Sequence, residues 1–460
     1  MVHAQAQTAG GGRPTQSTFL EGITPMIHRP SIVAGLIAAL LAAEPFSTAA
    51  APIPSPDSPR GQPPGASPAQ SKVDAGLKAL NAGELVAAET AFTEAARVDP
   101  KLSAAYIGLA EVAARQNKPA RVEHWLKQAL TADPNGALTQ RTWGRYQFQQ
   151  GRFVDAEATF KKAVALDPRS VDAQLNLAEN YLLGLKKAKP AEDAYRAAIA
   201  LDAGNPQAHA GLAATLAAQG HPDAALAEYE QAVRLAPADP KFAHALARFL
   251  ASQGKFDQAM AAQQKIIAMA PDFFPAYIDL GDLYLAKGNL DQAANTYRSA
   301  TKVTKNPALA FFKLGTVLEG QQRWAEAEQA YLEAVQNDPM MYGAYNNLAF
   351  MAAVRKERLD DALVWARKAV ELAPKVTTIQ DTLGWVHRAR GELGPAAQAI
   401  EKAVAANPKK AGFRYHLGVV YAEQGKKKEA VAALQKALEL DPNFNQAADA
   451  RQRLQQLSAK

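Results

Sequence analysis

Apolar and small residues recur at spacings of three and four along most of the chain, which is the period of an amphipathic helix. The stretch from Ala276 to Val303 shows this pattern as two short helical faces that are separated by Gly288. The residues on the two faces are Tyr277, Leu280, Gly281 and Tyr284, followed by Ala293, Tyr297 and Ala300. The pattern returns about every 34 residues from roughly residue 69 to residue 442, and such a period predicts a helical solenoid.

Proline marks the end of most repeats. Its ring clashes with the preceding helical turn, so a proline just past a helix stops that helix. The prolines at this place are Pro100, Pro134, Pro168, Pro237, Pro271, Pro339, Pro374, Pro408 and Pro442. Two further repeats have Ala203 and Lys305 there instead, which brings the array to about eleven units.

Glycine marks the middle of many repeats, where it can adopt the left-handed conformation that ends a helix. The glycines at this place are Gly83, Gly151, Gly220, Gly254, Gly288, Gly391 and Gly425. Acidic residues follow soon after, at Asp155, Asp223, Asp257 and Asp291, and we expect them to cap the second helix and to meet its positive end. Within a unit, Gly281 and Ala293 are predicted to lie where the two helices cross, because small residues let backbones approach.

Two repeats are one residue longer than the others. Their central turns, Leu183–Asp193 and Ala353–Asp361, are rich in Lys and Arg. Insertions on a solenoid lie along one edge and can carry recognition. The alternative is an exposed loop that happens to be basic.

The segment from Met26 to Pro52 has the layout of a secretory signal peptide, predicted over residues 26–51. His28 and Arg29 precede an uncharged apolar run at residues 32–43, and small residues follow it. The run is too short to span a bilayer comfortably. We therefore expect a periplasmic or exported protein that starts at Met26, with residues 1–25 as an over-extended N-terminus. A membrane anchor at residues 32–43 and a cytoplasmic protein are the alternatives, and the anchor would be the protein's only membrane contact.

Residues 52–71 are dense in proline and are predicted to form a disordered linker. The repeat array is expected over residues 72–442. Residues 443–460 are predicted to form a capping helix with a polar outer face, because a solenoid otherwise ends on an exposed apolar surface.

The composition and the absence of motifs argue against several classes of function. Lys and Arg number 51 and Asp and Glu 45, interspersed along the chain, so a nucleic-acid partner is not expected. The chain has no cysteine, which excludes disulfides, thiolate catalysis and a lipidated N-terminal cysteine. Histidines are scattered, and neither a zinc-binding H-E-x-x-H motif nor a phosphate-binding glycine loop occurs. We therefore expect no enzyme activity, no metal and no cofactor.

The repeats resemble the tetratricopeptide repeat (TPR) family. The unit from Ala308 shows the family pattern of large and small residues, with Phe311, Leu314, Gly315, Leu318, Ala327, Tyr331, Ala334 and Pro339. The unit from Ser103 matches with Tyr106, Leu109, Ala110, Val122, Leu126, Ala129 and Pro134. The resemblance extends over about four-fifths of the chain. It implies an all-α, right-handed superhelical solenoid of about eleven helix-turn-helix units with a C-terminal capping helix.

The resemblance also implies that the first helix of each unit lines a concave groove. Inward positions that packing does not need are the candidate partner-binding residues. They are Arg141, Arg145, Asn176, His244, Arg248, Asp279, Asp282, Phe312, Asn346, Asn347, Asp381, Trp385, Arg388 and Tyr415. Glu179, Lys313 and His416 occupy equivalent positions. Trp385 and Arg388 can form an anchor pair on the groove wall. The alternative is that Trp385 packs against a neighbouring helix and Arg388 is solvated.

The family's chaperone-binding members carry a carboxylate clamp of Lys and Asn that no unit here reproduces. The asparagine ladder of other members is represented only by Asn176 and Asn347. We therefore expect a non-catalytic scaffold of a bacterial cell envelope that binds a peptide or protein, in secretion or surface-polysaccharide assembly. The alternatives are direct binding of a polysaccharide and an intracellular adaptor or co-chaperone.

Overall fold

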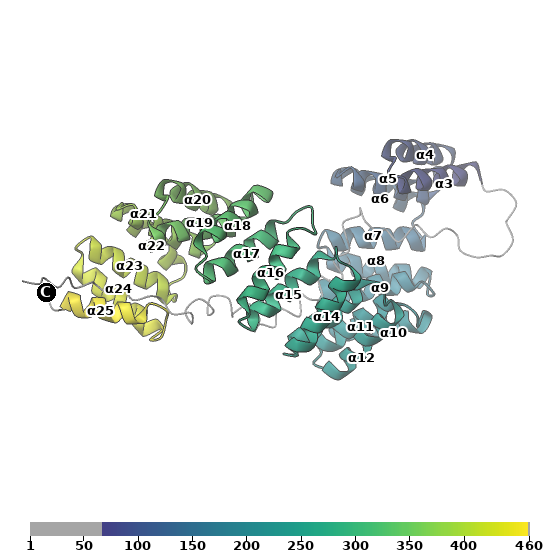
Figure 1. Cartoon of the computed structure of the whole chain (residues 1–460). Helices are drawn as coiled ribbons and strands as arrows, with labels where there is room; N and C mark the ends of the chain where they lie inside the picture. The colour runs from purple at the N-terminus through teal and green to yellow at the C-terminus, as the bar shows by residue number, and fades with distance from the viewer. Residues whose placement is uncertain (1–66, 459–460) are drawn as a thin grey trace, which may run out of the picture. The chain divides into compact units, whose positions relative to one another are not determined.

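A computed structural model describes residues 67–458, which form α-helices and one π-helical turn and contain no β-strand (Figure 1). The chain divides between Ala262 and Gln263 into two compact bodies, and each is described by itself. The first is the N-terminal body, residues 67–262, and the second is the C-terminal body, residues 263–458. The predicted all-α solenoid is confirmed.

The helices of the N-terminal body are α3 (Pro68–Asn81), α4 (Leu85–Val98), α5 (Ser103–Arg115), α6 (Pro119–Ala132), α7 (Ala137–Gln149), α8 (Phe153–Leu166), α9 (Val171–Glu179), the π-helical η2 (Asn180–Gly184), α10 (Ala188–Leu201), α11 (Pro206–Ala218), α12 (Pro222–Leu235) and α13 (Pro240–Ser252). Helix α14 (Phe256–Met269) contains the boundary between the bodies. Those of the C-terminal body are α15 (Phe274–Ala286), α16 (Leu290–Ala300), α17 (Ala308–Gly320), α18 (Trp324–Asn337), α19 (Tyr342–Arg355), α20 (Leu359–Leu372), α21 (Thr377–Ala389), α22 (Leu393–Ala406), α23 (Ala411–Glu423), α24 (Lys427–Leu440) and α25 (Ala447–Ser458).

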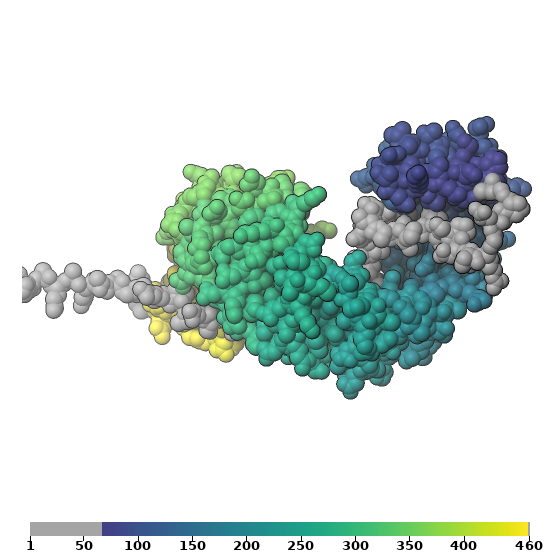
Figure 2. Space-filling model, turned by 45° about the vertical axis from the view of Figure 1, so that its right-hand side comes forward, coloured from purple at the N-terminus to yellow at the C-terminus, as the bar shows by residue number. Residues whose placement is uncertain are grey.

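Each unit pairs a first helix with a second helix, as in α17 with α18 and α21 with α22. First helices of neighbouring units also contact one another, as α19 contacts α21 and α21 contacts α23. The layer of first helices is therefore the more crowded layer of each curved stack, and its free surface is called the inner face below. Side chains fill the spaces between neighbouring ribbons of the C-terminal body, whose teal and green parts form an unbroken surface in Figure 2.

Glycine and an aromatic residue meet where the two helices of a unit cross. A Cβ atom added at Gly281 would lie 2.3 Å from Cε1 of Tyr297, and Tyr297 is fully buried. Ala293 is also fully buried. The prediction that Gly281 and Ala293 lie at the helix crossing is confirmed. Gly315 and Tyr331 repeat this contact in the next unit.

The turn between the two helices of a unit contains a left-handed residue, as predicted. All seven predicted glycines have φ between 71° and 82°. At the same place, the four other units use Asn117, Lys186, Gln322 and Lys356, which also have positive φ. The prediction that the acidic residues cap the second helices is wrong. In α8, for example, the N-cap residue is Arg152, which makes no side-chain capping bond, and Asp155 lies inside the first turn. Its carboxylate there can still meet the positive end of the helix.

The two longer repeats accommodate their extra residue differently. In the first, α9 continues into η2, and the buried Asn180 donates from Nδ2 to the carbonyl oxygen of Phe153 at 3.0 Å. In the second, α19 ends regularly, and both Lys356 and Arg358 adopt left-handed conformations. The extra residue thus widens a helix in one unit and lengthens the turn in the other.

The described residues begin close to the predicted start of the array. Helix α3 begins at Pro68, with the Ser67 hydroxyl accepting from the Gln70 amide at 3.2 Å, whereas the linker was predicted to reach residue 71. The predicted signal peptide and residues 52–66 of the linker lie outside the described residues. At the other end, α25 packs through Ala447 and Ala450 against a cluster that includes Val419 and Leu434. This helix covers the last repeat, as expected for a cap.

Candidate functional site

The candidate partner-binding residues all lie on first helices, and they are divided between the two bodies. Those on α7, α9 and α13 of the N-terminal body are Arg141, Arg145, Asn176, His244 and Arg248. Those on α15, α17, α19, α21 and α23 of the C-terminal body are Asp279, Asp282, Phe312, Asn346, Asn347, Asp381, Trp385, Arg388 and Tyr415. All are partly exposed except Asp381 and Tyr415, which are buried.

On the inner face of the N-terminal body, arginines alternate with acidic residues. Arg141 forms an ion pair with Asp172 of the following unit. Arg145 lies close enough to Glu111 and Glu179 for its charge to lower the pKa of both carboxyl groups. Burial nevertheless dominates, because it raises the pKa of Glu179 to about 7 against the opposing effects of the Gln207 amide and Arg145. The charges of Arg141 and Arg145 are therefore partly neutralised within the chain.

The C-terminal body places buried tyrosine hydroxyls beneath inner-face carboxylates. The Tyr297 hydroxyl donates to Oδ1 of Asp282 at 2.5 Å, and Lys313 Nζ lies 2.7 Å from the same oxygen. Lys313 belongs to the following unit, so this cluster joins two units across the inner face. Burial, and then the Asp282 charge, raise the pKa of Tyr297 far above its ordinary value.

One unit further along, the Tyr331 hydroxyl donates to Glu319 Oε2 at 2.6 Å. Asn347 Nδ2 donates to the Tyr331 hydroxyl oxygen at 3.1 Å, and the Phe312 ring lies 6.0 Å from the Tyr331 ring. Burial raises the pKa of Glu319 to about 7, and the hydrogen bond from Tyr331 only partly offsets this effect. Glu319 thus changes its protonation state near neutral pH.

A further inner-face cluster joins α21 to α23. The Trp385 ring stacks on His416 with a centroid distance of 4.1 Å, and the Arg388 guanidinium carbon lies 4.4 Å from the Trp385 ring centroid. Arg388 also forms an ion pair with Glu423 at 2.5 Å, and His416 Nδ1 lies 2.7 Å from Asp381 Oδ2. Trp385 and Arg388 are therefore held in place by neighbouring side chains while both stay partly exposed.

Tyr415 is placed differently from the expectation of an open groove residue. It is 7% exposed, and its hydroxyl donates to Asp449 Oδ2 of α25 at 2.7 Å. Burial, followed by this bond, raises the pKa of Tyr415 to about 12. The capping helix therefore binds the hydroxyl of Tyr415. The periodicity of the repeats does not predict this contact.

Sequence reasoning missed Glu111 and Glu319, although both stand at inward positions of their units. It also assigned Tyr297 and Tyr331 to packing alone, whereas each hydroxyl bonds an inner-face carboxylate. The residue type at the crossing position could have indicated these bonds. Tyr297 and Tyr331 carry a hydroxyl there, whereas Phe92 and Phe160 of other units do not.

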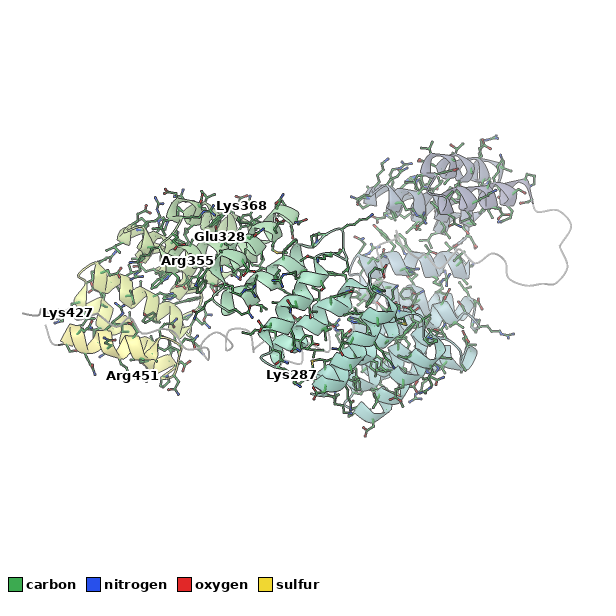
Figure 3. All side chains as sticks on the ribbon, in the orientation of Figure 1. Lys287, Glu328, Arg355, Lys368, Lys427 and Arg451 are labelled. Atoms are coloured by element: carbon green, nitrogen blue, oxygen red, sulfur yellow. The ribbon has the colours of Figure 1, made fainter. Side chains whose placement is uncertain are left out.

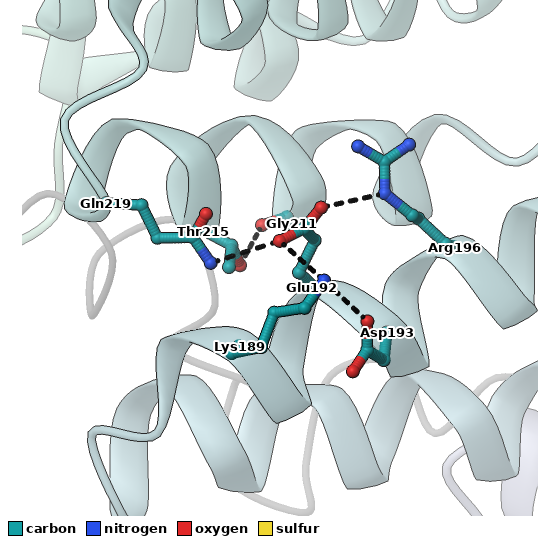
Figure 4. A network of polar contacts seen from close by, with 7 residues as sticks. All are labelled: Lys189, Glu192, Asp193, Arg196, Gly211, Thr215 and Gln219. Atoms are coloured by element: carbon teal, nitrogen blue, oxygen red, sulfur yellow. Dashed lines mark hydrogen bonds and ion pairs between the residues drawn. The ribbon is translucent and has the colours of Figure 1, made fainter.

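A second region with polar contacts between units is called the turn edge below. It consists of the central turns of the units and the adjoining starts of the second helices. Here a glutamate of one unit contacts a donor of the next, as Glu192 accepts from Gln219 at 3.2 Å (Figure 4). The two basic loops take part in the same way: Lys187 pairs with Glu157 at 2.9 Å, and Arg358 pairs with Glu328, which is labelled in Figure 3. One basic residue of each loop thus connects two successive units.

Residues 67–458 also bear on metal binding and on membrane association. No group of three or more His, Cys, Asp or Glu side chains in this part is arranged to hold a metal ion. None of its helices combines the length and the apolar character needed to cross a membrane.

Several solved structures are similar to the chain in fold. One is Cut9–Hcn1, a hetero-tetramer of the APC/C, at 15% identity over 85% of this chain and 96% of that chain, with a TM-score of 0.43. Another is yeast Tom70, at 13% identity, the same coverages and a TM-score of 0.40. A third is a TPR protein from Parabacteroides merdae, at 17% identity over 55% of this chain and 99% of that chain, with a TM-score of 0.42. No curated protein matches the sequence.

The family comparison covers most of the described chain. A family model described as tetratricopeptide repeat matches residues 73–137, 141–206, 278–341, 312–376 and 382–443. Two further models with the same description match residues 206–249 and 240–273. The chain belongs to the tetratricopeptide repeat family.

Proposed function

We propose that this protein is an exported, non-catalytic scaffold of a bacterial cell envelope that binds a peptide or protein segment along the inner face of its C-terminal body. TPR arrays are protein–protein interaction scaffolds, and they generally bind protein or peptide partners. The finer proposal places the contact between Asn346 and Tyr415. Secretion or surface-polysaccharide assembly would be the setting.

The arrangement of Trp385 and Arg388 carries this proposal. Tryptophan and arginine dominate binding energy at protein interfaces. Here both are partly exposed, and His416 and Glu423 hold them in position. A side chain that is already ordered loses less entropy when a partner binds. The pair can therefore act as a preformed anchor.

The test is crosslinking in cells followed by identification of the captured partner. A Trp385→Ala, Arg388→Ala double variant should reduce capture about tenfold or more, because each anchor typically contributes over 1 kcal/mol. The chain offers a matched control in Arg358, in the turn before α20, and Trp365, within α20: the Arg358 guanidinium carbon lies 5.0 Å from the indole centroid. Alanine at both of these positions should leave capture unchanged. Full capture by the inner-face variant would move the binding site elsewhere.

Export rests on the sequence of residues 26–51 and needs its own experiment. Fractionation of cells should place the protein in the periplasm or outside the cell, and sequencing of its mature N-terminus should begin near Ala50–Pro52. Recovery of an uncleaved chain from the cytoplasm would contradict export and leave an intracellular adaptor.

Added polysaccharide separates protein recognition from direct polysaccharide binding. If the partner is a protein, capture should be equal with and without the polymer. Capture that requires the polysaccharide, or retention of the purified chain on the polymer alone, would favour the alternative function.

A further inference from the structure

Two hydrogen-bond acceptors on the inner face of the C-terminal body have no donor within the described residues. Asp381 is 7% exposed, and its Oδ2 atom contacts His416, but its Oδ1 atom has no hydrogen-bond partner. Oδ1 of Asn346 likewise has none, while its Nδ2 donates to Asn347 at 3.3 Å. Buried acceptors are nearly always paired in native proteins, because an unpaired one opposes folding. Packing alone therefore does not explain these two atoms.

The two acceptors occupy the same register on neighbouring helices. Asn346 is the fifth residue of α19 and Asp381 is the fifth residue of α21. These helices contact each other directly. Small residues allow this approach, because Ala349 and Ala353 of α19 share a buried cluster with Val386 of α21. Asn346 and Asp381 thus occupy equivalent positions on adjacent helices of the inner face.

Two cations of this surface already have carboxylate partners. Lys313 pairs with Asp282 at 2.7 Å, and Arg388 pairs with Glu423 at 2.5 Å. Asp381 pairs only with His416, and no Lys or Arg among residues 67–458 forms an ion pair with it. The local arrangement therefore leaves a carboxylate oxygen that can accept from a cation supplied by another molecule.

We propose that Asp381 Oδ1 and Asn346 Oδ1 receive the lysine or arginine side chain of a partner polypeptide. The inference rests on the proposed function and names the chemistry of its partner. An ammonium or guanidinium group supplies several donors, and a planar guanidinium can bond two acceptors at once. Phe350 lies one turn along α19 from Asn346 and is partly exposed, so the aliphatic stem of the incoming side chain can pack on its ring.

Synthetic probes test this proposal without knowledge of the natural partner. We would titrate the full chain, at 150 mM salt, into three fluorescein-labelled Gly/Ser peptides of equal length. One peptide carries arginines, one carries glutamates in their place, and one is neutral. The expected result is an anisotropy rise with the arginine peptide and none with the others. Absence of binding to the arginine peptide, or stronger binding of the glutamate peptide, would overturn the proposal.

Two variants locate the binding on the inner face. Asp381→Asn keeps the shape of the side chain but removes its charge, and it should weaken binding of the arginine peptide about tenfold or more. Asn346→Ala should weaken it to a smaller extent, because it removes a neutral acceptor. Asp360→Asn is the matched control: it removes the same charge from a side chain that is 95% exposed at the turn edge, and binding should be unchanged.

Further outcomes separate this inference from the function on which it rests. If Asp381→Asn and Asp360→Asn bind the arginine peptide equally well, the binding is general surface electrostatics and the inference fails. If cellular capture depends on Trp385 but not on Asp381, the scaffold function stands and the inference alone fails. Hydrogen exchange in α21 and α23 shows whether Asp381→Asn remains folded, and Asn346→Ala supplies the test if it does not.

Discussion

Glutamates at the turn edge and glutamates on the inner face have opposite acid–base properties, although both kinds lie on the same type of repeat. At the edge, hydrogen bonds from Lys161 and Lys187 lower the pKa of Glu157, and Arg196 does the same for Glu192. On the inner face, burial raises the pKa of Glu111 despite its bond with Arg115, and it raises that of Glu319 to about 7.

This difference separates carboxylates that stabilise the folded state from carboxylates that oppose it. A carboxylate whose pKa is lowered on folding stabilises the folded state at neutral pH, whereas one whose pKa is raised opposes it. The edge glutamates join successive units and are explained by stacking. Glu319 opposes folding above pH 7, and its position on the inner face, where we propose that a partner binds, offers the alternative explanation, which is function.

The largest effect should come from removing the charge of Glu319. Its folded pKa is about 7 and its unfolded pKa is about 4.5, so the folded state loses stability as pH rises between these values. The difference corresponds to ~3 kcal/mol above pH 7 as an order of magnitude. Glu319→Gln should therefore stabilise α17 and α18 at pH 8 and have little effect at pH 4, as measured by denaturant unfolding. Equal effects at both pH values would remove the contrast between the two regions.

Glycine substitutions compare the helix crossing with the turn edge. Gly281→Ala places a methyl group against the buried Tyr297 ring and should destabilise its unit by ~1–3 kcal/mol. Gly288→Ala meets no atom within 4 Å, so only its positive φ should matter, and after the gain in chain entropy the net cost should be about 0.5–1 kcal/mol. Hydrogen exchange in α15 and α16 reports both changes. A larger effect at Gly288 would show that backbone conformation outweighs packing here.

Glu157→Gln tests the edge. Its folded pKa is lowered, so its contribution is present at neutral pH and is lost as pH falls below about 4.5 and through the folded value. Exposed pairs contribute little, and we expect a loss of less than ~1 kcal/mol at pH 7 that high salt reduces. Glu328→Gln provides the equivalent change beside the second longer repeat. A loss that grows at low pH would contradict the assignment.

The smallest effect should come from Lys356→Gly in the second longer repeat. Lys356 has φ of 56°, and a left-handed residue with a Cβ atom costs about 1–2 kcal/mol. Glycine removes this cost but adds ~0.5–1 kcal/mol of chain entropy, so a net gain of about 0.5 kcal/mol is expected. Asn117→Gly should gain less, because asparagine tolerates this conformation. Thermal unfolding of the two variants measures the difference.

Sequence periodicity predicted the repeats, the glycine turns and the helix crossings because these depend on local spacing. Gly288, for example, could be assigned its left-handed conformation from its place in the repeat alone. The widened helix at Asn180 could not be predicted, since repeat spacing shows that a residue is inserted but not whether it enters the helix or the turn.

The candidate site was predictable only in part. The inward register of Trp385 and Arg388 followed from the repeat, but their contacts with His416 and Glu423 depend on a unit about 34 residues away. Tyr415 shows the limit most clearly, because a helix outside the repeat pattern takes up its hydroxyl. Side-chain pairing between units has no signal in the periodicity of either unit.

The left-handed turn residues also provide positions for site-specific labels in spectroscopic distance measurements. The chain has no cysteine, so each introduced thiol would be the sole site for a label. Gln322 and Lys356 already adopt the strained conformation with a side chain present, at the same place in neighbouring units. Cysteines at these two positions would give a pair of labels whose separation reports bending of the C-terminal body when a partner binds.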